Sequence, residues 1–63
     1  MQKWEYLSVT TLPGEIYSIN GERPETKILY LDYLAQKGAE GWELISVINT
    51  ESGRDLVFKR PSN

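Results

Sequence analysis

The segment LDYLAQKGAEGWELISV, residues 31–47, decides the fold of this chain. Apolar residues recur at spacings of three and four before Gly38, which indicates an amphipathic helix whose core-facing residues are Ile28, Leu31, Leu34 and Ala35. Gly38 is expected to end that helix in the left-handed conformation, and Gly41 is expected to let the backbone reverse. Trp42 then begins an apolar strand and is expected to anchor the helix to the sheet. One short segment therefore specifies a helix, a turn and a strand.

The same segment carries a resemblance to a known family. The motif Gly-x-Glu-Gly-Trp-Glu-Leu-x-Ser-Val at 38–47, with Trp-Glu-Tyr at 4–6 and Phe-Lys-Arg-Pro at 58–61, resembles a family of very small bacterial and phage domains. This family is domain of unknown function forty-one seventy-seven. The resemblance covers both ends and the middle of the chain, and leaves out residues 11–25. It implies a strand-helix-strand-strand order and brings no catalytic residue with it.

The length of 63 residues is enough for one small domain. A core of this size rarely supplies more than about 3–5 kcal/mol, so small domains usually add disulfides, a metal or a partner subunit. Cysteine and histidine are both absent from the sequence, which excludes disulfides and the usual zinc and iron sites. We therefore expect no cofactor and predict a homodimer.

The charge balance disfavours several classes of partner. Seven basic and nine acidic side chains give a net charge of −2, whereas binding to a nucleic-acid backbone needs clustered lysine and arginine. No apolar run approaches the roughly 20 residues of a membrane helix, and the N-terminal residues MQKWE lack an apolar signal core. We expect a cytoplasmic protein with neither nucleic acid nor membrane as its partner.

The chain divides into elements by pattern. Residues 3–11 and 42–50 are rich in β-branched, aromatic and other apolar residues, and are predicted to be strands, as are residues 54–60. Pro24 suits the first turn of a helix, which is predicted over residues 24–37. Residues 12–23 are predicted to be a loop. A short strand over 15–19 is an alternative there, because Pro13-Gly14 suits a type II turn.

These elements predict an α+β fold in a single small domain. The last two strands are expected to form an antiparallel hairpin, and a right-handed crossover through the helix brings in the first strand. The result is a three-stranded sheet of order 1-3-2 with one helix on one face. The other face would remain open, and we expect it to pack against the same face of a second copy.

Aromatic and apolar residues outside the predicted core form the candidate interaction surface. Tyrosine is common at protein interfaces because it combines a flat apolar ring with a polar tip. The candidate residues are Trp4, Tyr6, Leu29, Tyr30 and Tyr33.

No catalytic site is predicted. Glu40 and Glu43 flank Gly41-Trp42, but spacing alone does not make them an acid–base pair, and solvated or backbone-bonded glutamates are the simpler interpretation. The serines have no histidine to activate them. The leading hypothesis is a non-catalytic, homo-oligomeric protein–protein interaction module. The alternative is a small-ligand sensor with an aromatic pocket lined by Trp4, Tyr6 and Trp42.

Overall fold

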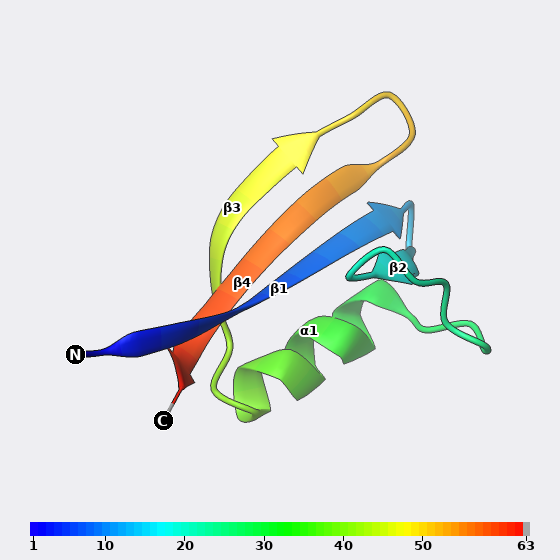
Figure 1. Cartoon of the computed structure of the whole chain (residues 1–63). Helices are drawn as coiled ribbons and strands as arrows, with labels where there is room; N and C mark the ends of the chain where they lie inside the picture. The colour runs from blue at the N-terminus through cyan, green and yellow to red at the C-terminus, as the bar shows by residue number, and fades with distance from the viewer. Residues whose placement is uncertain (63) are drawn as a thin grey trace.

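The computed structural model describes residues 1–62 and contains four strands and one helix (Figure 1). The elements are β1 (Lys3–Leu12), β2 (Glu15–Ile19), α1 (Tyr30–Ala39), β3 (Glu43–Asn49) and β4 (Arg54–Ser62). The strands form one sheet of order β2-β1-β4-β3, and each neighbouring pair is antiparallel. The helix lies against one face of the sheet, beneath β1 and β2 (Figure 1).

The predicted three-stranded sheet of order 1-3-2 is wrong, because residues 15–19 form the edge strand β2, which was the alternative to a loop there. Gly14, with φ +78°, turns the chain back after Pro13, so that β2 pairs with the end of β1. Asn20 holds the far end of β2: its N–H donates to the Ser8 carbonyl at 2.6 Å, and its Oδ1 accepts from the Ser8 N–H at 2.9 Å. These long-range bonds stabilise a strand that local pattern leaves ambiguous.

The helix begins at Tyr30 and not at residue 24, so the predicted range 24–37 is wrong at its start. The residue before the helix, Leu29, is extended, with φ −75° and ψ 138°. The Ile16 N–H donates to the Ile28 carbonyl at 2.9 Å, and the Tyr30 N–H donates to the Gly14 carbonyl at 3.1 Å. Backbone bonds to the β1–β2 hairpin thus replace the first helical turn that Pro24 suggested.

The helix ends at Ala39, two residues later than predicted, and is followed by a glycine in the left-handed conformation. Gly38 lies inside the helix, whereas Gly41 has φ +88°. The Trp42 N–H donates to the Lys37 carbonyl at 3.0 Å, and the Gly41 N–H donates to the Gly38 carbonyl at 3.1 Å. This is the pair of bonds of a Schellman motif, in which the left-handed residue follows the helix cap. The left-handed role predicted for Gly38 therefore belongs to Gly41.

The core lies between α1 and the face of the sheet that the helix covers. Strand alternation places Leu7 and Val9 of β1 on this face, and Trp4 and Tyr6 on the other. The buried cluster draws on β1, β2, β4 and α1: Leu7, Val9, Ile16, Tyr33, Leu56 and Phe58. The largest side chains that are completely buried are Val9 and Leu56.

The helix presents a different stripe to the core from the one its spacing suggested. Tyr33 is only 3% exposed, whereas Leu31, which the apolar periodicity placed in the core, is 74% exposed. Tyr30, one turn before Tyr33, and Leu34, one turn after Tyr30, are half-buried against the cluster. Burial raises the pKa of the Tyr33 hydroxyl, and the nearby Glu40 carboxylate raises it further.

Arg60 joins the end of the helix to the sheet. Its Nη1 donates to the Glu40 carbonyl at 3.0 Å, and its Cζ lies 4.3 Å from the centroid of the Trp42 ring. Its Nε lies 3.5 Å from a carboxylate oxygen of Glu5 on β1. The guanidinium thus contacts the helix cap, the Trp42 ring after the turn and the neighbouring strand β1, and it holds the turn around Gly41 against the sheet.

Strand β4 continues past the predicted end at residue 60 and includes Pro61. Proline disrupts a central strand because it has no N–H to donate. Pairing between β3 and β4 begins at Glu43 and Lys59, however, so Pro61 lies beyond the part of β4 that β3 flanks. At that end β4 behaves as an edge strand, where a proline is tolerated.

Candidate functional site

Strand β3 forms one edge of the sheet (Figure 1), and it exposes apolar side chains along its length. Leu44 and Val47 lie opposite Phe58 and Leu56, which belong to the core, so both are on the helix-covered face. Their exposed fractions, together with those of Ile45 and Ile48, lie between 43% and 55%. These four residues, Leu44, Ile45, Val47 and Ile48, are called the β3 surface below.

The position of the helix explains why this strand is uncovered. Helix α1 lies beneath β1 and β2, and β3 is at the opposite edge of the sheet (Figure 1). Among the described residues, the buried cluster contains no residue of β3. Strands β1, β2 and β4 contribute to the buried cluster with α1, and the apolar residues of β3 extend past this covered part of the sheet.

The edge of β3 also lacks the features that usually protect an edge strand. Natural edge strands commonly carry lysine, proline or an inward-pointing charge, which discourage pairing with another chain. Residues 44–49, LISVIN, contain no charged residue and no proline. A register irregularity between Leu44 and Ser46 distorts the start of the strand, but pairing with β4 is regular from Ser46 to Asn49. An apolar, uncharged and regular edge is typical of a strand that binds a partner.

The candidate residues predicted from sequence do not form one surface. Trp4 and Tyr6 are exposed on the face of the sheet away from the helix, where the Nζ of Lys59 lies 4.3 Å from the centroid of the Trp4 ring. Leu29 is exposed and Tyr30 is half-buried, and both lie at the start of the helix. Tyr33 is part of the core, so it cannot belong to an exposed interaction surface.

The β3 surface was missed because the strand was expected to be covered. Residues 42–50 are apolar on both faces, a pattern that usually indicates a strand buried on both sides. The same pattern also fits an edge strand that is covered only in an assembly. The absence of any charge between Glu43 and Glu51 is the sequence signal that could have identified this surface.

Within the single chain, Trp4, Tyr6 and Trp42 do not line one pocket. Trp42 packs against the core cluster on the helix-covered face, whereas Trp4 and Tyr6 lie on the opposite face of the sheet. The two glutamates that flank Gly41-Trp42 belong to different elements. Glu40 accepts a hydrogen bond from the Nζ of Lys37 at 3.0 Å, and Glu43 is the residue that begins β3. Within residues 1–62, no three acidic side chains converge as metal ligands.

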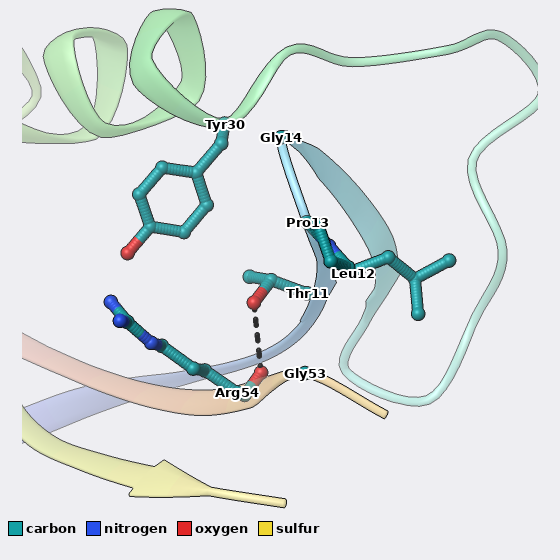
Figure 2. Close-up of a pocket in the computed structure, with 7 residues that line it drawn as sticks. All are labelled: Thr11, Leu12, Pro13, Gly14, Tyr30, Gly53 and Arg54. Carbon is teal, nitrogen blue, oxygen red and sulfur yellow. Dashed lines mark hydrogen bonds between the residues drawn. The ribbon is translucent and has the colours of Figure 1, made fainter. Parts of the chain in front are cut away.

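A separate hollow of about 330 Å³ lies where the β1–β2 turn, the start of α1 and the start of β4 meet. In Figure 2 the Tyr30 hydroxyl and the Arg54 guanidinium point toward one another across it. The Thr11 Oγ1 donates to the Arg54 carbonyl at 3.1 Å and joins β1 to β4 beside the hollow. Its volume is at the lower end for small-molecule sites. The lining residues are Thr11, Leu12, Pro13, Gly14, Tyr30, Gly53 and Arg54.

Comparison of the chain with protein-family models, curated proteins and solved structures finds no match. The resemblance to the small bacterial and phage family therefore stays a prediction. Among the described residues, no helix has the length and apolar character needed to cross a membrane.

Proposed function

We propose that this chain is a non-catalytic, cytoplasmic protein–protein interaction module that self-associates, and that the β3 surface is where it binds. The observation that carries the proposal is the uncharged edge strand with four half-exposed aliphatic side chains. An enzyme is a weaker candidate, since the sequence offers no histidine or cysteine and its serines lack the usual activating base.

The area of the isolated chain supports self-association. A compact monomer of 7.2 kDa is expected to expose about 4,100 Å² by the empirical scaling of surface with mass. This chain exposes 4688 Å². The excess is roughly 600 Å² per copy, or about 1,200 Å² for two copies, which matches the lower end of specific protein–protein interfaces.

The shape of the chain agrees with its surface area. The radius of gyration is 11.9 Å, which is larger than the value of about 10.6 Å expected for a compact domain of 63 residues. The principal extents of 38 × 22 × 18 Å describe an elongated body. Association along a long edge would make the assembly more compact than the single chain.

The apolar contribution to binding follows from the exposed fractions. Full burial of a valine, leucine or isoleucine is worth about 1.5–3 kcal/mol, so each half-exposed side chain of the β3 surface has about 1 kcal/mol left to gain. Two copies together gain at most about 8 kcal/mol, because pairing along the edge only partly covers side chains that lie on both faces of β3. This upper value is comparable with the estimated 4–15 kcal/mol lost when two molecules associate. Backbone hydrogen bonds across the edge add about 1 kcal/mol each. The total gain exceeds only the lower part of this cost range, so we expect weak association, with a dissociation constant between about 1 µM and 1 mM.

Sedimentation velocity over a range of roughly 1 µM to 1 mM tests the proposal. The wild-type chain should change from monomer to dimer within that range. Ile48→Lys should shift the midpoint to at least tenfold higher concentration, because it places a charge on the β3 surface. Leu31→Lys is the matched control, since Leu31 is equally aliphatic and more exposed but lies on α1. A wild-type chain that remains monomeric throughout contradicts the proposal.

A small-ligand sensor is the second candidate, and the hollow at Arg54 is the observation that favours it. Among residues 1–62, Arg54 has no carboxylate within ion-pair distance, unlike Arg60. A guanidinium facing a tyrosine hydroxyl would suit a small carboxylate or phosphate ligand. Thermal-shift screening against such anions tests this function. A ligand should raise the unfolding midpoint of the wild-type chain but not that of Arg54→Ala.

A further inference from the structure

We infer that the partner of β3 is a second copy of the same strand, paired antiparallel about a two-fold axis at Val47. The two four-stranded sheets then form one continuous sheet of eight strands. This inference rests on the proposed function and deepens it, because it names the occupant of the edge, the direction of the added strand and the register.

The geometry of an edge strand favours its own copy. A two-fold axis perpendicular to the sheet relates two β3 strands in antiparallel orientation, so each outward N–H can meet an outward carbonyl of the copy. Directly opposite like charges would destabilise such a pair. Residues 44–49 carry no charge, so the self-paired stretch has none to oppose.

The irregularity at the start of β3 restricts the register, and we place the axis at Val47. Opposite residues of an antiparallel pair must point to the same face of the sheet. Centring the axis on Val47 sets Ser46 opposite Ile48 of the copy, and both residues lie on the face away from the helix, because their β4 partners Val57 and Asp55 are two residues apart.

A register centred on Ser46 fails the same requirement. It would set Leu44 opposite Ile48 of the copy. Leu44 pairs with Phe58 and Ile48 pairs with Asp55, which are three residues apart on β4, so the two side chains lie on opposite faces. The axis at Val47 keeps the irregular part of each strand outside the central pairs.

The arrangement of the layers leaves the approach to β3 open. Helix α1 lies beneath β1 and β2, so the helices of the two copies would be far apart on the same face of the joined sheet (Figure 1). The open face, which the sequence suggested as the dimer contact, is less suitable. Register partners place Glu43 and Lys59 on it together, with Asp55 further along β4, and these charges would be desolvated by face-to-face packing.

Disulfide trapping tests the pairing, and the wild-type chain has no cysteine to interfere. Single cysteines are placed at positions 44–49, and each variant is oxidised at a concentration where the wild-type chain is dimeric. Val47→Cys should cross-link to itself at least tenfold faster than Ser46→Cys or Ile48→Cys alone. An equimolar mixture of Ser46→Cys and Ile48→Cys should yield mainly the mixed disulfide. Leu31→Cys, on the exposed side of α1, is the control and should cross-link slowly.

The outcomes separate this inference from the function on which it rests. A dimer by sedimentation in which position 47 cross-links no faster than position 31 overturns the strand pairing and leaves self-association standing. A chain that stays monomeric at all concentrations overturns both. A cross-linking maximum at any position other than 47 overturns the register, and a fast mixed disulfide between positions 46 and 48 supports it. Circular dichroism of each variant confirms that the exposed substitutions leave the fold intact.

Discussion

Replacing Gly38 with alanine should stabilise the protein, and the sign of the effect tests how the helix ends. Gly38 lies inside α1, has no positive φ, and an added Cβ would have no atom within 4 Å. Alanine is about 0.5–1 kcal/mol better than glycine at an interior helical position. No contact is lost or strained, so the gain should be realised nearly in full. Gly38→Ala should raise the free energy of unfolding by about that amount.

Thermal and urea denaturation monitored by circular dichroism measure the change. For a domain of this size, 1 kcal/mol corresponds to a midpoint shift of about 4–8 °C, so a rise of roughly 2–8 °C is expected. All variants are compared at one protein concentration, since self-association makes the midpoint concentration-dependent. Gly41→Ala is the matched control. Its φ of +88° forces alanine into a left-handed conformation, and it should destabilise by about 1–2 kcal/mol.

Opposite signs at two glycines three residues apart are specific to the observed helix end. If the helix instead ended at Gly38 in the left-handed conformation, Gly38→Ala would destabilise by about 1 kcal/mol and Gly41→Ala would be the milder change. A loss of stability in Gly38→Ala would therefore refute the Schellman cap at Gly41.

Three further substitutions test the core and its edges. Gly53→Ala should destabilise by about 1–3 kcal/mol, the cost typical of overpacking, because its Cβ would clash with the backbone oxygen of Thr11. Urea denaturation measures this change, and a neutral result would contradict the close approach. Leu56→Ala, at a completely buried position, should cost about 2–5 kcal/mol and leave the chain largely unfolded at 37 °C, whereas Leu31→Ala should change stability by less than about 0.5 kcal/mol. Burial raises the folded-state pKa of Tyr33 above its unfolded value of 10.0, so the stability that this residue contributes is complete below pH 10 and is lost as the pH rises toward the folded-state pKa. Tyr33→Phe should therefore flatten the fall in unfolding free energy above pH 10, and an unchanged slope would contradict this expectation.

The local pattern of this chain determined several elements without tertiary information. Gly38, Gly41 and Trp42 predicted a helix followed by a reversal and a strand. The structure has α1, the turn at Gly41 and β3 in this order. Pro13-Gly14 predicted a turn, and Gly14 has the positive φ that such a turn requires. These features were predictable because backbone restrictions of proline and glycine act on immediate neighbours.

Only the tertiary structure decided the number of strands, the start of the helix and the exposed edge. Strand β2 and the extended segment before Tyr30 depend on hydrogen bonds to residues distant in sequence, such as Asn20 to Ser8 and Ile16 to Ile28. The placement of α1 beneath β1 and β2 then buried Tyr33 and left β3 uncovered. Periodicity shows that a segment has an apolar face, but which face is covered depends on where the other elements pack, and that information is not local.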